Sequence, residues 1–364
     1  MKIGIITFHC AHNYGAVLQA YASKFFLESL GHDVYFIDYR PRFLTHKYKV
    51  FNLYRFFSFS ISKTIKKISY ELPLLCDRRL KYIKFEKFIN NYLLCDGLRS
   101  CKTIEDYKKL DCIYLGSDQI WNTDLVGTDI SFYLGDLGLD VPVFSYGASL
   151  ESNISIKYKD IFTKSLKRMV AVSVREIESQ RLLKEDVDID SEFVVDPTLL
   201  LTNEQWSNII EPMDVDKPYV LFYYFGHDMN TINSAEIFAK KNGCELFIVS
   251  VGVYKDKRYI NNISPENFLW LIKNASYVLT NSYHGTVFSI IFDKPFYTLK
   301  KKGSNIRIYN LCDLSGYKDR IIDSIDTDLE WKELSYPNVN LSNSIKKSKQ
   351  FINQTIIRIN ENIR

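Results

Sequence analysis

The chain has 364 residues, of which 46% are hydrophobic and 25% are charged, and its formal net charge at pH 7 is +4. This length is enough for two domains, and no apolar run reaches the ~18 residues of a membrane span or forms the core of a signal peptide. Seven scattered cysteines without a C-x-x-C pair argue against a disulfide framework and against a zinc site. Together these features predict a cytoplasmic protein.

Short apolar runs rich in β-branched and aromatic residues alternate with helical patterns along the chain. This alternation is typical of parallel α/β architecture. A polar, proline-containing stretch at 203–218 predicts a domain boundary near residue 200. We expect a first domain over 1–200, a second over 201–335, and a helical segment over 336–364 that packs back on the first. The predicted strands span residues 3–8, 34–38, 111–117, 143–149, 171–176, 192–197, 219–225, 245–251, 277–282 and 295–299.

One segment departs from this alternation. Residues 40–102 hold 15 Lys and Arg but only four acidic residues, so their net charge is +11 while the rest of the chain carries −7. This basic, aromatic-rich insertion, over about 43–105, is either a solvated helical cover of the first sheet or a surface for an anionic acceptor. Such an acceptor is a polyanionic glycan or a lipid phosphate, the latter at the inner face of a membrane. Nucleic acid is disfavoured because no binding motif accompanies the charge.

The first predicted strand runs into a turn that is unusually rich in polar side chains. Ligands of open parallel sheets bind beyond the carboxyl ends of the strands. The turn lacks the glycines of a dinucleotide fingerprint, and no P-loop occurs, so its side chains suit a small anion or sugar hydroxyls better than a pyrophosphate. The candidate binding residues here, beside His9, are His12, Asn13, Tyr14 and Gly15.

Polar residues also follow other strands of the first domain. Asp118 can orient a base or a hydroxyl, or cap a helix. Arg175 suits a carboxylate or phosphate ligand, or forms a salt bridge to a neighbouring glutamate. Asp196, before Pro197, is interpreted as structural because it ends a strand. The candidates are Ser117, Asp118 and Gln119 after the third strand, Ser145 in the fourth, and Arg175 and Glu176 after the fifth.

The stretch TNSYHGTVFSIIF (280–292) is the most informative part of the second domain. A strand ends at Ser282 and an apolar helix is expected from about Gly285. Free amides of Gly285, Thr286 and Val287 would then form an anion site at the positive end of the helix dipole. His284 can donate a proton there, or can merely cap the helix.

Six motifs occur here in one order, and together they resemble the polysaccharide pyruvyl transferase family. The resemblance covers about residues 2–320 and weakens over 43–105. It implies a GT-B-like fold, in which two Rossmann-like domains face each other across a cleft. It also implies transfer of pyruvate from phosphoenolpyruvate onto sugar hydroxyls, usually as a ketal, on a polysaccharide or a lipid-linked precursor. The motifs are NYGAVLQAYA, GSDQIWN, FSYGAS, VSVRE, VVDPTLLL and TNSYHGTVFSIIF.

The resemblance also suggests roles for individual residues. His284 matches the histidine of the family's R-x-H motif, whereas Ser282 stands in place of its arginine. Arg175 matches the other basic position, and the cations of 300–302 and Arg307 can supply the missing charge. We expect His284 to be the general acid that protonates the methylene carbon of the donor. The expected base is Asp118 or Glu176, and the scheme requires no metal or other cofactor.

Two other functions stay open. A GT-B glycosyltransferase that uses a nucleotide sugar would share the fold and an anion site. A non-catalytic glycan-binding relative is the third interpretation, because Ser282 departs from the family motif. Comparison of phosphoenolpyruvate with a nucleotide sugar as a ligand separates the two donor classes.

Overall fold

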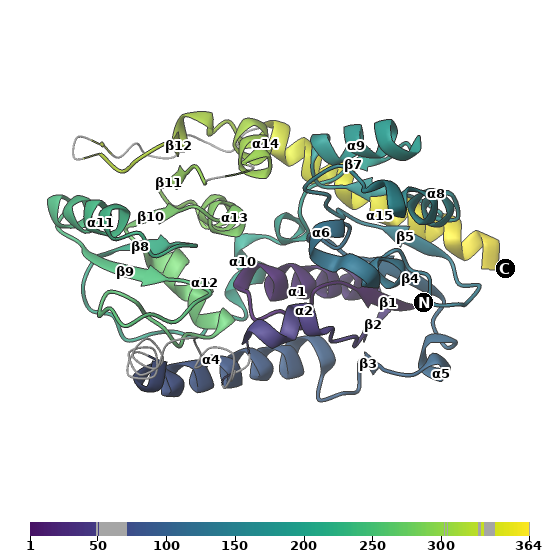
Figure 1. The fold of residues 1–364 in the computed structure, drawn as a ribbon, viewed down its shortest axis with the longest axis horizontal. Coiled ribbons are helices and arrows are strands. Elements are labelled where there is room, and N and C mark those ends of the chain that lie inside the picture. Colours follow the sequence, from purple (N-terminus) through teal and green to yellow (C-terminus); the bar gives the residue numbers. More distant parts are fainter. Residues whose placement is uncertain are drawn as a thin grey trace, which may run out of the picture.

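Two parallel β-sheets, each covered by helices, make up the protein (Figure 1). The computed structural model describes residues 1–48, 50, 71–301, 303, 305–326, 329–330 and 339–363. The first sheet has the strand order β3-β2-β1-β4-β5, and the parallel pair β6-β7 continues it through isolated bridges to β5. The second sheet has the order β12-β11-β10-β8-β9.

The strands are short, and most of their residues are buried. Those of the first sheet are β1 (Lys2–Ile6), β2 (Asp33–Ile37), β3 (Ser100–Cys101), β4 (Cys112–Leu115), β5 (Val143–Ser145), β6 (Ser173–Val174) and β7 (Glu192–Phe193). Those of the second are β8 (Tyr219–Tyr223), β9 (Glu245–Val249), β10 (Tyr277–Thr280), β11 (Phe296–Leu299) and β12 (Ile321–Ile322).

Helices connect nearly all successive strands, as parallel pairing requires. In the first half they are α1 (Tyr14–Ser29), α2 (Arg42–Thr45), α4 (Leu75–Phe88), α5 (Ile104–Tyr107), α6 (Thr123–Val126), α7 (Ile130–Tyr133), α8 (Lys159–Lys167) and α9 (Ile177–Val187). In the second half they are α10 (Asn203–Ser207), α11 (Met229–Lys241), α12 (Pro265–Asn274), α13 (Tyr283–Ile291), α14 (Ile306–Ser315) and α15 (Val339–Ile363). Within the described ranges, none of these helices is both long enough and apolar enough to cross a membrane.

The predicted fold class is confirmed. Each of the ten apolar runs contains a strand, and every pairing between neighbouring strands is parallel. The two-residue strands β3 and β12, at sheet edges, were not predicted, because they do not lie in a longer apolar run as the equally short β6 and β7 do. The chain passes from β7 to β8 between Phe193 and Tyr219, and the domain boundary near residue 200 stays a prediction.

Helix α15 packs against the first sheet although it follows the second in the chain (Figure 1). The Ser348 hydroxyl accepts a hydrogen bond from the Val195 backbone amide at 2.9 Å. Nη1 of Arg358 donates to the Val170 carbonyl at 3.2 Å. Helix α15 is therefore held against the first half of the protein.

The first helix joins the two halves through one continuous hydrophobic core. Tyr14, at the start of α1, is fully buried, and its ring stacks on Phe268 of α12 with centroids 4.5 Å apart. Its hydroxyl donates to the Ile263 carbonyl at 3.3 Å. Tyr14, a predicted binding residue, thus lies in the contact between the domains rather than in an open site.

The described part of the basic insertion also bridges the domains. The structure does not describe residues 49 and 51–70, which include Lys63, Lys66 and Lys67. It does describe the whole of α4. Lys84 Nζ donates to the Asn262 carbonyl at 2.6 Å, and Asp77 accepts from the Asn262 side chain at 2.6 Å. In α4 at least, charges that the sequence suggested for an acceptor contact the second domain.

Lys81 makes the most buried of these contacts and gives a pH-dependent prediction. Its Nζ donates to the Ser250 carbonyl at 2.5 Å, and burial lowers the pKa of Lys81 to about 7. The folded protein then releases this proton near pH 7, whereas an unfolded lysine holds it to about pH 10.4. Between these values the unfolded state binds more protons, so the lysine's contribution to stability rises with pH.

We expect the unfolding free energy of the wild type, minus that of Lys81→Met, to rise between about pH 7 and 10, by at most about 1.4 kcal/mol per unit. Urea unfolding of both proteins at the two ends of this range measures the difference. The same difference at both pH values would contradict the proposed titration of Lys81.

Candidate active site

A pocket of about 210 Å³ lies between the two domains, at the carboxyl ends of strands from both sheets. This is the position that open parallel sheets use for ligands. The first domain contributes Phe8, Asn13, Ala16, Leu44, Tyr48, Asp118, Gln119 and Leu125, and the second contributes Phe225, Ser282, Tyr283, His284, Lys301 and Arg307.

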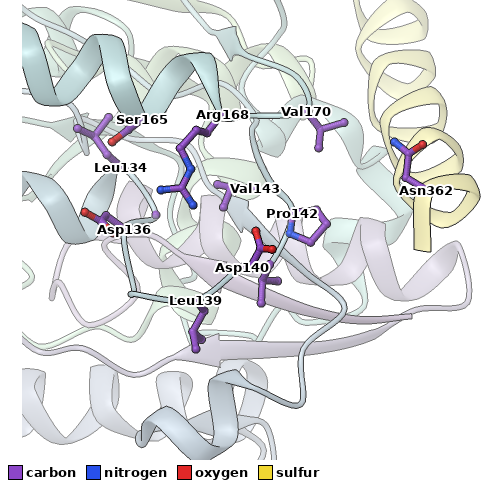
Figure 2. Close-up of a pocket in the computed structure, with 12 residues that line it drawn as sticks. Leu134, Asp136, Leu139, Asp140, Pro142, Val143, Ser165, Arg168, Val170 and Asn362 are labelled. Carbon is purple, nitrogen blue, oxygen red and sulfur yellow. The ribbon is translucent and has the colours of Figure 1, made fainter. Parts of the chain in front are cut away.

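Larger hollows occur elsewhere, and one of about 420 Å³ is drawn in Figure 2. It lies at the amino end of β5, where Asp136, Asp140 and Arg168 surround it (Figure 2). These three side chains belong to exposed residues, and none of the polar motifs at the carboxyl ends of the strands reaches this hollow. The smaller interdomain pocket is therefore the candidate site.

His284 reaches this pocket from the first turn of α13. The helix begins at Tyr283, two residues earlier than predicted, with Ser282 at the N-cap position. The amide of Thr286 donates to the Ser282 carbonyl at 3.1 Å, so the prediction that this amide is free for an anion is wrong. The amides that precede this first helical bond are those of Tyr283, His284 and Gly285.

The imidazole of His284 packs directly against the backbone of α1. A Cβ atom added at Gly15 would lie 2.0 Å from Nδ1 of His284. Asn13 caps this helix, because its Oδ1 accepts from the Gly15 amide at 3.0 Å and lies 3.5 Å from the Ala16 amide. In the Asn-Tyr-Gly motif, Asn13 therefore caps α1, and Gly15 leaves the space that the His284 ring of the second domain occupies.

Asp196 faces the other side of the same imidazole. Its Oδ2 lies 3.6 Å from Nε2 of His284, and its side chain is fully buried. Thr198 donates to Oδ1 from its amide at 3.0 Å and from its hydroxyl at 2.6 Å. Burial by itself would raise the pKa of Asp196, but the charges of His284 and Arg175 outweigh it and hold that pKa well below its usual value.

Asp196 is the residue that sequence reasoning missed. An Asp-Pro pair at a strand end has an ordinary structural explanation, and the same carboxylate does cap the turn Pro197–Leu200. Its second role depends on a histidine 88 positions later in the chain. The only sequence signal was that VVDPTLLL belongs to the ordered set of motifs.

Arg175 is fully buried and does not line the pocket. Its guanidinium contacts three carboxylates: Nη1 lies 2.6 Å from Asp196, Nε lies 3.1 Å from Glu176, and Nη2 lies 3.4 Å from Asp118. Nη1 also donates to the Ser117 hydroxyl at 3.0 Å. In this geometry Arg175 positions one carboxylate that lines the pocket, Asp118, and two that lie behind it. Its predicted contact with a ligand stays a prediction.

Replacement of Arg175 should therefore mainly lower the stability of the folded protein. Removing one partner from a buried ionic cluster costs about 3–5 kcal/mol, because unpaired buried charges are left behind. We expect Arg175→Ala to lower the unfolding free energy by that amount in urea. The control is Arg181→Ala, whose half-exposed side chain pairs with Glu178 and should cost at most about 1 kcal/mol.

An Arg175→Ala protein as stable as the Arg181→Ala control, but weakened in donor binding, would contradict the positioning role. It would support direct recognition of the donor by Arg175.

The two carboxylates predicted as bases occupy different environments. Asp118 lines the pocket and has a backbone φ of +87°, a left-handed conformation that is unusual for a residue other than glycine. Glu176 is buried away from the pocket, where Ser149 and Ser179 donate to it at 2.8 and 2.9 Å. Ser145 is also internal, because its hydroxyl donates to the Ser173 carbonyl at 3.1 Å.

The two histidines of the first turn are held by carboxylates outside the pocket. His9 Nε2 lies 3.0 Å from Asp38, and His12 Nε2 lies 2.8 Å from Glu86 of α4. Arg40 contacts both carboxylates, at 2.8 Å from Asp38 and 3.0 Å from Glu86. This network fixes the turn that carries Asn13 and Gly15.

The pocket's positive charge comes from Lys301 and Arg307. Burial, followed by repulsion from Arg307, lowers the pKa of Lys301. Its Nζ lies 5.5 Å from the centre of the Phe225 ring. The predicted cation Lys300 is instead exposed, 2.8 Å from Asp323, and Lys302 lies outside the described residues. Both lysines directly follow β11, and of the two Lys301 lines the pocket.

The other predicted binding residues also fall into two groups, those that line the pocket and those that lie behind it. Gln119 and Ser282 line the pocket, whereas Gly285 and Thr286 support it from behind. A Cβ at Gly285 would lie 2.3 Å from Thr280 Oγ1, and the Thr286 hydroxyl lies 2.8 Å from that of Thr298. These two residues hold α13 against the second sheet.

Solved structures show the same fold at low sequence identity. UDP-N-acetylglucosamine 2-epimerase from Rickettsia bellii aligns with a TM-score of 0.54 and 11% identity, over 99% of this chain and 97% of that one. The UDP-GlcNAc 2-epimerase from Neisseria meningitidis, bound to UDP-GlcNAc, aligns with a TM-score of 0.51 and 12% identity, over 98% and 100%. These likenesses support the GT-B-like fold and carry no conclusion about activity.

The family is shown by the sequence itself. No curated protein matches the chain. The family model described as polysaccharide pyruvyl transferase matches residues 13–303, which include Asn13, Asp196, His284 and Lys301. The chain therefore belongs to the polysaccharide pyruvyl transferase family.

Proposed function

We propose that this protein transfers pyruvate from phosphoenolpyruvate onto the hydroxyls of a sugar and closes a ketal. The observation that carries the proposal is the placement of one histidine and two cations, His284, Lys301 and Arg307, in the small pocket between the domains. The acceptor we propose is a polysaccharide or lipid-linked oligosaccharide precursor. A lipid-linked acceptor would bring the protein to the inner face of the membrane.

The pocket suits a small, highly charged donor. Its volume of about 210 Å³ is below the roughly 300–1,000 Å³ typical of pockets for drug-sized ligands, so it favours a three-carbon phosphoester over a whole nucleotide sugar. Lys301 offers a partly buried ammonium, and Arg307 offers a planar fork for a carboxylate or phosphate. We infer that these two residues supply the positive charge that the family's arginine would supply and that Ser282, at the same position, lacks.

His284 is the proposed general acid. A proton moves from its imidazolium to the methylene carbon of the donor while a sugar hydroxyl adds to the adjacent carbon. The Asp196 carboxylate lies beside this ring, with Oδ2 3.6 Å from Nε2. Phosphate then leaves from the same carbon, and a second hydroxyl closes the ketal. In this scheme the chain's own side chains supply the acid and the anion contacts.

Calorimetric titration with phosphoenolpyruvate and with UDP-GlcNAc tests the donor. We expect the first ligand to bind and the second to bind weakly or not at all. Lys301→Met should weaken phosphoenolpyruvate binding by about ten- to a hundredfold, the usual effect of losing a charge-assisted contact. Lys300→Met is a matched control on the adjacent position and should bind as the wild type does.

Tighter binding of UDP-GlcNAc than of phosphoenolpyruvate would favour the glycosyltransferase interpretation instead. Equal loss of affinity in Lys300→Met and Lys301→Met would contradict the assignment of Lys301 to the pocket.

A further inference from the structure

Glu151 stands between the two domains in the loop that follows β5. The side-chain amides of Gln119 and Asn122 both donate to its Oε2, with Asn122 at 3.3 Å. Its Oε1 lies 4.0 Å from Nη2 of Arg307, which belongs to the second domain. Since Gln119 and Arg307 line the pocket, the Glu151 carboxylate lies beside it.

The two oxygens of this carboxylate differ. Oε2 is fixed by two amides, whereas no donor from the described residues lies within hydrogen-bond distance of Oε1. The side chain as a whole is 38% exposed. A carboxylate held at one oxygen and open at the other is suited to accept a proton from an incoming hydroxyl.

Two of the other carboxylates near the pocket, Glu176 and Asp196, have both oxygens engaged, and Asp118 is held at one oxygen. Asp118 Oδ1 accepts from the Gln119 amide at 2.9 Å and from Arg175 at 3.4 Å. Both oxygens of Glu176 accept hydrogen bonds from serines, and both oxygens of Asp196 are engaged by Thr198 or Arg175. Asp118 also keeps one oxygen, Oδ2, without a donor among the described residues, but its side chain is only 17% exposed and its other oxygen lies 3.4 Å from buried Arg175. The Glu151 side chain is 38% exposed and so is the more open of the two to an incoming sugar.

We propose that Glu151 receives the acceptor sugar and is the general base for its attacking hydroxyl, an inference that rests on the proposed pyruvyl transfer. The hydroxyl oxygen forms a bond to the central carbon of the donor, and its proton passes to Oε1 of Glu151. In the same step the methylene carbon takes a proton from His284, which makes the methyl group. Loss of phosphate then breaks the old carbon–oxygen bond. The second hydroxyl adds at this carbon, and its proton goes to the departing phosphate.

Glu151→Gln tests this role because it keeps the shape of the side chain and removes its basicity. With phosphoenolpyruvate and a panel of p-nitrophenyl hexopyranosides as acceptors, we expect turnover to fall by roughly 10²–10⁴-fold. Donor affinity should stay the same or increase a few fold, because a negative charge beside Arg307 is removed. A carboxylate base should give the wild type an acidic limb in its pH–rate profile, and this limb should be absent from Glu151→Gln. Glu105→Gln is the control, since Glu105 is an exposed glutamate paired with Lys108 and should be unaffected.

The outcomes separate the two levels of the proposal. Pyruvate transfer by Glu151→Gln at the wild-type rate overturns the role of Glu151 and leaves the proposed function standing. Weakened donor binding with unchanged turnover also overturns it, since that pattern belongs to a structural latch with Arg307. Absence of transfer by the wild type across the whole panel overturns both. Melting temperatures of all variants identify any loss of folding.

Discussion

Replacing His284 with alanine should slow pyruvate transfer by roughly 10²–10⁴-fold, the usual contribution of a general acid. Affinity for phosphoenolpyruvate should change much less, because Lys301 and Arg307 stay in place. Phosphate release measured against donor concentration separates turnover from binding. His284→Gln should not restore the rate, because an amide can donate a hydrogen bond but cannot transfer a proton to carbon.

Near-normal turnover in His284→Ala would contradict the catalytic assignment. The histidine would then be a packing residue between α1 and α13.

Adding one methyl group at Gly15 should disable the site from the opposite domain. The new Cβ would lie 2.0 Å from Nδ1 of His284, far inside contact distance, so the imidazole or α1 must shift. Overpacking of this kind costs about 1–3 kcal/mol, and a displaced imidazole would also lose its alignment with Asp196. We expect Gly15→Ala to lower both the melting temperature and the rate of transfer.

The double variant Gly15→Ala/His284→Ala is the matched control. Without the imidazole the methyl group has room, so the second substitution should recover most of the stability that Gly15→Ala loses, while activity stays low. If Gly15→Ala is equally destabilising with and without His284, the contact between the new methyl group and the His284 ring is not the cause of the destabilisation.

The sequence predicted the fold because strand alternation depends on local patterns. Apolar runs of five to seven residues marked the strands, and the carboxyl ends of those strands marked the edge where the pocket lies. His284, Asn13, Asp118 and Gln119 were all selected for this reason, and all line the pocket. A side chain that directly follows a parallel strand is placed by the strand itself.

Partners across long distances in the chain could not be predicted in the same way. Arg175 was chosen as a cation for a ligand, but its guanidinium is surrounded by Glu176, Asp118 and Asp196. His12 had the right residue type and position, yet Glu86 of the basic insertion holds it. Each of these outcomes depends on a contact between segments that only the folded chain brings together.

The cation pair shows a finer limit. The sequence located positive charge at 300–302 and 307, but it did not show which of two adjacent lysines reaches the pocket. Register decided that Lys301 faces the pocket and that Lys300 pairs with Asp323. If the strand before them ended one residue later or earlier, the two lysines could exchange roles. A run of three lysines does not indicate which of them will face the pocket.

The most direct test of the account is to follow the carbon of the donor. The wild-type protein, incubated with carbon-13-labelled phosphoenolpyruvate and the hexopyranoside panel, should release phosphate and place the label in a sugar ketal, detected by NMR and mass spectrometry. One phosphate should appear for each ketal formed, and His284→Ala should form almost none. If the donor stays intact with every acceptor while UDP-GlcNAc is consumed under the same conditions, the central claim of pyruvyl transfer is wrong.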